Sequence, residues 1–319
     1  MAIGTEDLKA LARRLGFQSV GVAEARPAQT IDAYIAWVAS GMHAEMAYLP
    51  NHIVAKRDPS ALLRGVRSVI AVALNYGQPN PARAGAPRIA RYALGRDYHK
   101  VLRGKLRTLA RHLGAVHSEA SFRICVDSAP LLEREYAQRA GLGWFGKNTC
   151  LIDSRSGSWF VLGFLLTTLE LEPDVPALGG CGTCRACIDA CPTGAIVLSK
   201  GRWAVDSRSC ISYFTIEKRG AFTEAEAAMV GGWTFGCDVC QEVCPFNQPR
   251  DSQPKRALDT VEPDFRATRT WPSLRELAQI REEAWDALTK GSPVRRVGLA
   301  GLRRNTQANL ANAEKTQAV

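Results

Sequence analysis

The chain of 319 residues has no hydrophobic run long enough to cross a membrane. Its longest apolar run extends only from Trp159 to Leu166, whereas a membrane-spanning helix needs about 20 apolar residues. The first residues also lack the basic start and the unbroken apolar stretch of a secretory signal peptide. We therefore expect a cytoplasmic protein that does not associate with membranes.

Low-complexity segments and solenoid repeats are missing as well, and the composition (46% hydrophobic, 23% charged) is that of a globular protein with more than one domain. A dinucleotide fingerprint is not found either. The G-x-G-x-x-G match from Gly141 to Gly146 follows a helical pattern instead of opening a βαβ unit. Asp97 and His99 begin the D-x-H-x-x-G signature of corrinoid domains, but Leu102 stands where its glycine belongs. Composition and spacing alone therefore identify neither cofactor.

Acidic residues are too few to balance the basic ones, because 31 Asp and Glu stand against 41 Lys and Arg, for a net charge of +10. The surplus is concentrated in two stretches. Nine basic residues and one acid, Asp97, lie between Arg83 and Arg111, and six basic residues and one acid, Glu314, lie between Lys290 and the end. Such stretches attract polyanions. For each of them, a solvated helix face rich in Lys and Arg is an equal alternative.

The hydrophobic pattern predicts an α+β protein in three parts. In the first part, residues 1–175, short apolar strands alternate with helical patterns, which favours a layered α/β domain. The predicted strands are Ser68–Tyr76, Phe122–Asp127 and Trp159–Leu169. Residues 176–250 form a cysteine-rich part. Residues 251–319 are mostly helical in pattern, and Ser292 and Pro293 suit the start of the last helix.

The segment Tyr98–Leu113 has the period of an amphipathic helix with one basic face. Its apolar side is predicted to consist of Val101, Leu102, Leu106, Leu109 and Leu113.

Ten cysteines are not expected to form disulfides in a cytoplasmic protein, because that compartment is reducing. Eight of them lie between Cys181 and Cys244, which indicates metal binding. The first motif, C-x2-C-x2-C-x3-C-P from Cys181 to Pro192, is the run of bacterial ferredoxins. In that run three thiolates hold one [4Fe–4S] cluster and the fourth reaches a second cluster. The alternative, a structural zinc site, would need four ligands in two pairs.

The second motif, C-x2-C-x3-C-P from Cys237 to Pro245, lacks one cysteine, and Cys210 upstream can supply the missing thiolate. Cross-ligation then predicts two groups of four. The first cysteine group is Cys181, Cys184, Cys187 and Cys244. The second cysteine group is Cys191, Cys210, Cys237 and Cys240. Cys125 and Cys150 are expected to be small buried hydrophobic residues, and no role is assigned to them.

The large N-terminal part suggests that the clusters carry electrons into a catalytic centre. The best candidate there is Asp127, which ends the apolar strand Phe122–Asp127 where α/β sheets place ligands and catalysts. Walled by apolar residues, its carboxyl group would have a raised pKa and could donate a proton. The following segment, 128–130, is expected to start a helix. From the residues alone, an ordinary Asp helix cap is therefore the favoured alternative.

Six segments together resemble the epoxyqueuosine reductase family, and they occur in the family's order over most of the chain. They are VDSAPLLERE (126–135), AGLGWFGKNT (140–149), CGTCRACIDACPTGAI (181–196), CISYFTIE (210–217), FGCDVCQEVCPFN (235–247) and GSPVRRVG (291–298). This combination is more specific than any ferredoxin motif alone. The chain is more distantly similar to the reductive dehalogenases, which share the corrinoid and cluster arrangement.

The resemblance implies reduction of epoxyqueuosine to queuosine at the wobble position of tRNA, the last step of queuosine biosynthesis. It implies cobalamin in a nitroreductase-like N-terminal domain, two [4Fe–4S] clusters in a ferredoxin-like domain, and an abbreviated HEAT-like C-terminal region. The family's proton donor falls on Asp127, and its cluster ligands fall on the two cysteine groups with the same cross-ligation. Cofactor contacts fall on Arg57, Asp127, Lys147 and Ser212.

The implied partners are the anticodon stem-loop of tRNA, bound by the basic stretches 83–111 and 290–304, and a low-potential electron donor of the flavodoxin or ferredoxin type. We expect a monomer. Two other functions remain open, a dehalogenase-like corrinoid reductase of a small molecule and a non-catalytic ferredoxin-type electron carrier. The positive charge weighs against the first, and Asp127 with its large domain weighs against the second.

Overall fold

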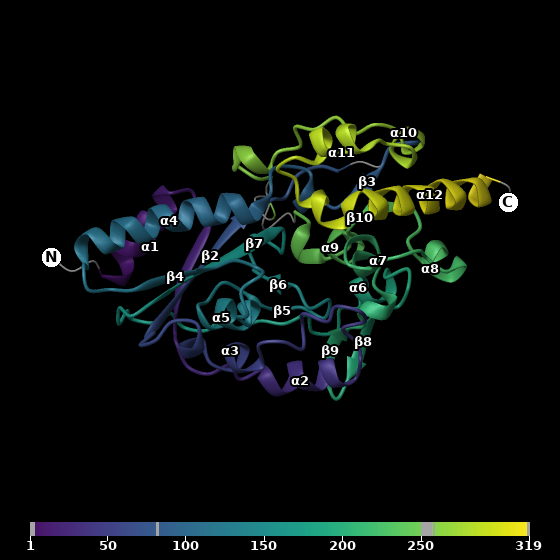
Figure 1. Cartoon of the computed structure of the whole chain (residues 1–319). Coiled ribbons are helices and arrows are strands. Elements are labelled where there is room, and N and C mark those ends of the chain that lie inside the picture. Colours follow the sequence, from purple (N-terminus) through teal and green to yellow (C-terminus); the bar gives the residue numbers. More distant parts are fainter. Residues whose placement is uncertain (1–3, 81–82, 250–256, 258, 318–319) are drawn as a thin grey trace.

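The computed structural model describes residues 4–80, 83–249, 257 and 259–317. Within these residues no helix is both long and apolar enough to cross a membrane. The predicted boundary between the second and third parts, at residues 250 and 251, lies outside the described residues. Figure 1 shows the sheet and its helices on one side of the molecule, and the cysteine-rich region and the C-terminal helices on the other.

A four-stranded sheet in the order β1-β2-β7-β4 forms the centre of the first part. All its neighbouring strands are antiparallel. The strands are β1 (Ser19–Glu24), β2 (Ser68–Asn75), β4 (Phe122–Cys125) and β7 (Phe160–Thr167). The last three confirm the predicted strands to within two residues at each end, whereas β1 was not predicted.

Strand β2 is buried on both faces, and its side chains alternate between two hydrophobic cores. Ile70, Val72 and Leu74 belong to one core, and Val69 and Ala71 belong to the other. Because an unbroken apolar strand can be buried on both sides, helices cover both faces of this sheet.

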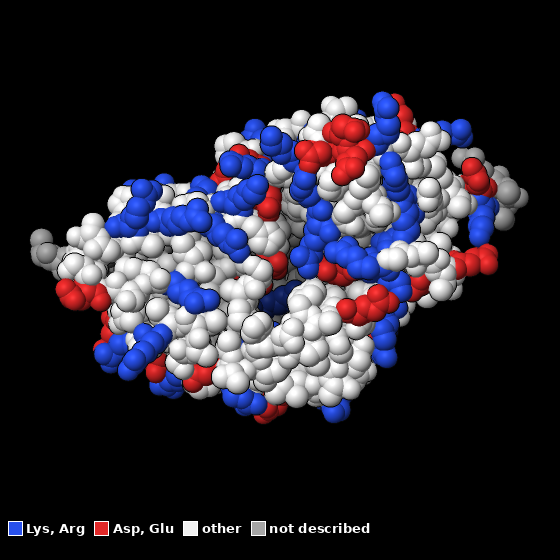
Figure 2. Space-filling view, in the orientation of Figure 1, with Lys and Arg blue, Asp and Glu red and all other residues white. Residues whose placement is uncertain are grey.

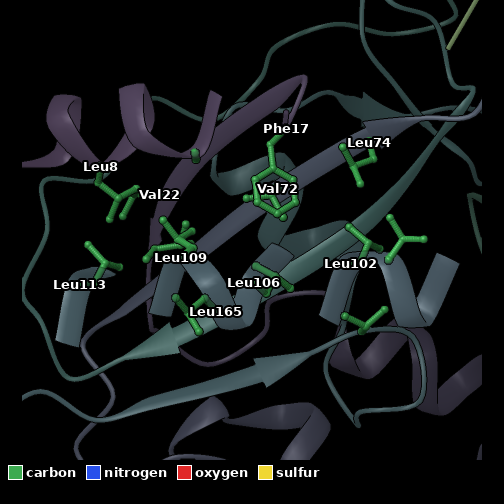
Figure 3. Close-up of a cluster of buried hydrophobic side chains, with 14 of the residues drawn as sticks. Leu8, Phe17, Val22, Val72, Leu74, Leu102, Leu106, Leu109, Leu113 and Leu165 are labelled. Atoms are coloured by element: carbon green, nitrogen blue, oxygen red, sulfur yellow. The ribbon is translucent and has the colours of Figure 1, made fainter. Parts of the chain in front are cut away.

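One face is covered by α1 (Thr5–Arg14) and α4 (Tyr98–Val116), which pack together with the sheet (Figure 3). The buried residues of α4 are Val101, Leu102, Leu106, Leu109 and Leu113, the five that its periodicity predicts. Asp97 caps this helix, since its carboxylate accepts a hydrogen bond from the His99 backbone N–H at 3.0 Å. The predicted amphipathic basic helix is thus confirmed.

The opposite face is covered by α5 (Glu133–Arg139), whose Tyr136 and Ala137 are buried against the sheet. The short helices α2 (Ile31–Ala39) and α3 (Ile53–Arg57) lie on the same side in Figure 1. Two small hairpin strands, β5 (Trp144–Phe145) and β6 (Leu151–Ile152), then lead toward the cysteine-rich region.

The cysteine-rich region consists of short elements around the two motifs. Its helices are α6 (Ala186–Asp189), α7 (Ile211–Ile216), α8 (Glu224–Met229) and α9 (Val239–Glu242). Its strands are the hairpin β8 (Ile196–Ser199) and β9 (Arg202–Val205), and β10 (Trp233–Phe235), which pairs in parallel with β3 (Arg88–Ile89) of the first part.

The C-terminal helices are α10 (Leu274–Ala278), α11 (Glu282–Thr289) and α12 (Gly298–Gln317). Ser292 and Pro293 start a 3-10 turn, Pro293–Val297, whose Ser292 hydroxyl accepts the Val294 N–H, and α12 follows directly. These elements share a core with β3, β10 and α7. In addition, Phe265 packs into the core on the α1 and α4 side of the sheet. The three predicted parts are therefore packed against one another.

Candidate active site between an acidic loop and two cysteine groups

The first cysteine group surrounds one small cavity. Cys181, Cys184, Cys187 and Cys244 line it, together with Asn148, Ile152, Pro245 and Phe246. Burial raises the pKa of Cys187 to about 11, and the charges of the other three thiols act in the same direction, which places all four close together. Within the described residues, no group of three His, Cys, Asp or Glu side chains is arranged to hold a single metal ion. Four sulfurs arranged around a cavity fit a cubane cluster.

The second cysteine group is also gathered in one place. Burial raises the pKa of Cys237 to about 12, and the charges of Cys210 and Cys191 add to the rise. The pKa of Cys240 is also raised, by a hydrogen bond with Cys150, by burial, and by the charges of neighbouring thiols that include Cys237 and Cys210. Cys210 lies at the N-terminal end of α7, where the backbone N–H groups of Ser212 and Tyr213 point at its sulfur. The cysteines of each predicted group thus lie near one another, and their ligation of two iron–sulfur clusters stays a prediction.

The segment 146–150 connects the two groups to the first part. Lys147 Nζ donates to the carbonyl oxygens of Gly182 and Cys184, at 2.7 and 2.8 Å. The buried amide of Asn148 accepts the Cys150 N–H at 3.2 Å and donates to the Cys240 carbonyl at 3.4 Å. These contacts hold the loops of both cysteine groups against the sheet part.

The two remaining cysteines differ from each other. Cys125 is fully buried in the core beside α5, as predicted for a small hydrophobic residue. Cys150 instead lies next to the second group, where its thiol shares a hydrogen bond with Cys240. The sequence carries no signal for this neighbour, because 90 residues separate the two cysteines.

Asp127 lies in an irregular segment between β4 and α5, in the left-handed backbone region with φ of 54°. Its backbone N–H donates to Glu133 Oε1 at 2.6 Å. Two expectations are wrong here. The helix begins at Glu133 and not at 128–130, so Asp127 does not cap it. The neighbouring strands are antiparallel, so the rule for the carboxyl ends of parallel strands does not account for its position.

The Asp127 carboxylate is paired with an imidazole. His99 Nε2 lies 2.9 Å from Asp127 Oδ2, and His99 Nδ1 lies 2.8 Å from Asp97 Oδ1. Burial disfavours the charged ring, but its hydrogen bonds to the two carboxylates outweigh this and raise the pKa of His99 to about 9. Burial likewise opposes ionisation of Asp127, yet His99, Arg296 and Tyr98 together hold the pKa of Asp127 below its usual value.

The predicted raised pKa of Asp127 is therefore wrong, because the predicted apolar wall is in fact a set of cationic and hydrogen-bonding partners. The two pKa shifts favour a protonated His99 beside an ionised Asp127. The group with a raised pKa is the neighbouring Glu133, whose pKa rises to about 8 through burial and through the charge of Asp127.

A second set of side chains links the segment between β4 and α5 that carries Asp127, here called the acidic loop, to the second cysteine group. Arg296, just before α12, pairs with Glu217 at 2.9 Å (Nη2 to Oε2) and lies over the ring of Tyr48. Glu217 ends α7, the helix that starts after Cys210. The Asp127 side chain itself remains 55% exposed. Figure 2 shows a hollow between the sheet part and the other two parts, with Lys or Arg atoms at its floor and Asp or Glu atoms at its edge.

Residues 56–128 match the family described as "Epoxyqueuosine reductase QueG, DUF1730", and residues 180–247 match the "4Fe-4S double cluster binding domain". The chain is 42% identical to the epoxyqueuosine reductase of Gloeobacter violaceus over 97% of both chains. It belongs to the epoxyqueuosine reductase family.

Two solved epoxyqueuosine reductase structures are similar over 98% of this chain and 82% of theirs. One, from Streptococcus thermophilus, has 28% identity and a TM-score of 0.84. The other contains an epoxyqueuosine-modified stem-loop of tRNA-Tyr and has 28% identity and a TM-score of 0.83. The mixed helix and sheet fold is thus that of the epoxyqueuosine reductases, and the double cluster domain contains all eight grouped cysteines.

Three further residues were predicted as cofactor contacts by resemblance. Arg57, at the end of α3, is half-exposed and lies 3.6 Å from Asp32. Ser212 is the second residue of α7, beside Cys210. The ammonium group of Lys147 is held by carbonyl oxygens of the first cysteine loop. The structure brings none of these three into contact with Asp127, and their role as corrinoid contacts stays a prediction.

The basic surface of this reductase is narrower than its sequence suggests. Several residues of the stretch 83–111 form internal ion pairs at 2.8 to 3.0 Å: Arg88 and Arg91 with Glu242, Arg96 with Asp264, and Lys105 with Glu262. Exposed basic side chains remain on α4, namely Lys100, Arg107 and Arg111. Lys and Arg cover the surface over α4 and over the segment before α12, on both sides of the hollow (Figure 2).

The residues that sequence reasoning missed are His99, Glu133, Arg296 and Tyr48. His99 and Asp97 carried a weak signal, since they were noticed only as an incomplete corrinoid signature. Glu133 and Arg296 lie in segments that resemble the family, but nothing in their spacing indicates that they approach Asp127.

Proposed function

We propose that this protein reduces epoxyqueuosine in tRNA to queuosine. The observation that carries the proposal is the Asp127 carboxylate, which is hydrogen-bonded to His99 and is linked through Arg296 and Glu217 to the double cluster domain. The overall match to epoxyqueuosine reductases over nearly the full chain supports it, as does the tRNA stem-loop bound to a similar structure.

The reaction converts an epoxide to an alkene and releases its oxygen as water. Two C–O bonds break, so two electrons and two protons are consumed. Bound cobalamin and two [4Fe–4S] clusters would supply the two electrons at low potential. The cysteine groups fit the clusters, because four thiols surround one cavity and four more are gathered nearby. For cobalamin, the support is the hollow between the parts of the molecule and the adjacent acidic loop (Figure 2).

The side chains of this chain provide the protons and the positive charge. Each C–O cleavage builds negative charge on the epoxide oxygen, and an acid within hydrogen-bond reach lowers that barrier. Asp127 is the exposed group of the acidic loop, so it is the residue placed to hand a proton to that oxygen. The imidazolium of His99 and the guanidinium of Arg296 stabilise negative charge at the same place.

The tRNA substrate would bind across the hollow. The exposed basic residues of α4 lie on one side, and the segment before α12 lies on the other (Figure 2). Phosphates of the anticodon stem-loop would contact these side chains. The modified base must leave its stack to reach Asp127. Arg103 of α4 donates to Ser128 Oγ at 3.0 Å, so this helix is connected directly to the loop that carries Asp127.

The finer assignments are part of the same proposal. Residues 1–175 form a nitroreductase-like cobalamin domain, residues 176–250 a ferredoxin-like domain, and residues 251–319 an abbreviated HEAT-like region that binds tRNA. Arg57, Lys147 and Ser212 contact the corrinoid. The protein acts as a cytoplasmic monomer and receives electrons from a flavodoxin or a ferredoxin.

The test is an anaerobic product assay. The clusters are reconstituted, and the protein is incubated with cobalamin, a low-potential reductant and tRNA that carries epoxyqueuosine. Nucleosides are then identified by mass spectrometry. We expect queuosine in the complete mixture and none when cobalamin is omitted. No queuosine from protein with both clusters and bound corrinoid would contradict the tRNA function and favour a small-molecule reductase. Failure to bind a corrinoid at all would favour an electron carrier.

A further inference from the structure

We propose that His99 is the proton store of the reaction, that Asp127 is the conduit between this store and the substrate, and that Asp97 holds the imidazole in its charged form. This inference rests on the proposed function for its chemistry. Its structural basis, a doubly hydrogen-bonded imidazole between two carboxylates, does not.

The hydrogen bonds determine where the proton lies. Both ring nitrogens of His99 face carboxylate oxygens, at 2.8 Å to Asp97 and 2.9 Å to Asp127. An ionised carboxylate only accepts hydrogen bonds, so both nitrogens must carry hydrogen. Asp97 is also fixed as an acceptor by the His99 backbone N–H, because it caps α4. The ring is therefore an imidazolium, and the Asp127 side chain is the acceptor of its Nε2–H.

The other groups around the ring favour the same state. Tyr98 stacks on the imidazole with a centroid distance of 4.1 Å, and burial raises the pKa of this phenol, which stays neutral. Glu133 accepts the Asp127 N–H, and its pKa of about 8 makes it mostly neutral at pH 7. Arg296 contributes positive charge toward Asp127. With the pKa of His99 at about 9, the ring remains charged through the neutral range.

Both protons of the reaction follow the same route from His99 through Asp127. When the first C–O bond breaks, the Nε2 proton moves to Asp127 Oδ2 and from there to the epoxide oxygen, leaving a hydroxyl group and a neutral imidazole. Solvent then protonates the His99 imidazole again, because the pair of His99 and Asp127 is partly exposed. When the second C–O bond breaks, the same route delivers a second proton to the departing hydroxide, which leaves as water. The two electrons come from the reduced cofactor.

Asp127 therefore touches the substrate, whereas His99 and Asp97 act through it. A carboxylic acid alone with a pKa below its usual value would be almost fully ionised at pH 7 and would be a poor acid. Pairing with an imidazolium solves this problem, because the proton is stored on the partner whose pKa lies above the working pH.

The test measures protonation and activity separately. Histidine side chains of the full-length protein, with oxidised clusters in place, are followed by nitrogen-15 NMR from pH 6 to 10. His99→Gln identifies the signal among the five histidines. We expect both ring nitrogens of His99 to stay protonated up to about pH 9. With Asp127→Asn or Asp97→Asn the titration should move down toward the ordinary value of about 6.5. A neutral His99 at pH 7 in the wild-type protein would overturn the inference whether or not queuosine is formed.

Single-turnover rates of queuosine formation provide the second readout. His99→Gln retains an N–H donor for Asp127 but cannot store a proton, so we expect a rate loss of about 100-fold or more at pH 8. The loss should be smaller at pH 6, where solvent can protonate Asp127. Asp97→Asn should stay active at pH 6 and lose activity at a lower pH than the wild type. A purely structural role would lower the rate equally at all pH values.

The two hypotheses fail in different ways. If the wild-type protein makes no queuosine, the proposed function fails, and the NMR titration still decides the protonation of His99. If the wild-type protein is active and the His99→Gln pH profile has the wild-type shape, the proton store is refuted.

Discussion

Asn247 offers a quantitative test of how the cysteine-rich region is attached to the sheet part. This residue follows Cys244 by three positions and is 7% exposed. Its Oδ1 accepts the Ser158 N–H at 2.7 Å, and its Nδ2 donates to Ser158 Oγ at 2.9 Å and to the Gln241 carbonyl at 2.8 Å. Ser158 lies two residues before β7. The amide thus connects the loop of the first cysteine group to the central sheet.

Asn247→Ala would leave one buried group, the Ser158 N–H, without its partner, whereas the Gln241 carbonyl would still accept the Cys244 N–H at 3.1 Å. Such a loss costs about 1 to 3 kcal/mol, so the free energy of unfolding should fall by about that amount. At about 2 °C per kcal/mol for a chain of this size, the melting temperature should fall by about 2 to 6 °C. Gly157 packs directly against this amide, because a Cβ on Gly157 would meet Asn247 Oδ1 at 2.2 Å.

The assay is thermal unfolding of the cluster-loaded protein, followed by circular dichroism, with iron content measured before and after a mild heat step. Gln248→Ala is the matched control, since Gln248 is the exposed next residue and makes one hydrogen bond to the Glu242 carbonyl. That substitution should change stability by no more than about 0.5 kcal/mol. If Asn247→Ala is as stable as Gln248→Ala, the buried amide does not hold the two parts together.

Three other predictions concern the clusters, the basic helix and the pH dependence. Cys184→Ser and Cys191→Ser should each lose about half of the iron, from different clusters, as seen by iron analysis and electron paramagnetic resonance. Arg107→Glu on the exposed face of α4 should weaken tRNA binding, measured by filter binding, and should reduce its salt dependence. The pKa of His99 is raised from 6.5 to about 9, so its contribution to stability is full below pH 6.5 and is lost as the pH rises through 9. Urea unfolding should show a loss of order 1 to 3 kcal/mol over this range that is smaller in His99→Gln, where the raised pKa of Glu133 still contributes.

Each of these has a control within the chain. Cys125→Ser changes a buried cysteine outside both groups and should keep all the iron, and equal iron loss there would contradict the partition. Arg64→Glu makes the same charge change at another exposed position and should weaken binding less than Arg107→Glu. A wild-type stability that is flat between pH 6.5 and 9 would contradict the charged state of His99.

Local patterns in the sequence predicted much of the architecture. Helix α4 was predicted with all five of its buried residues, because amphipathic periodicity is a local property. The two cysteine groups were predicted from spacing, since short loops limit which thiols can reach one cluster. Strand β1 was missed because Gly21 interrupts its apolar pattern. A Cβ at Gly21 would meet the Ala140 carbonyl at 1.9 Å, so this glycine is required by packing against the end of α5, which the sequence does not show.

The electrostatics of the site could not be predicted, because they depend on residues far apart in the chain. Asp127 was recognised as a candidate acid, but the direction of its pKa shift was wrong. The shift is set by His99, which is 28 residues away, and by Arg296, which is in the C-terminal part. The basic stretch 83–111 was overestimated for the same reason, since its charges are partly used in ion pairs with residues 238–264.

The central claim is that Asp127 delivers protons to the epoxide of a tRNA-bound base, and the most direct measurement is a single-turnover comparison of wild type with Asp127→Asn. Asp7→Asn, an exposed change on α1, is the control. Iron content, corrinoid binding and tRNA affinity are measured on the same samples. We predict queuosine at the same rate from wild type and Asp7→Asn, and a rate at least about 100-fold lower from Asp127→Asn at saturating cobalamin, with iron content and tRNA affinity unchanged. A wild-type rate from Asp127→Asn would contradict the account.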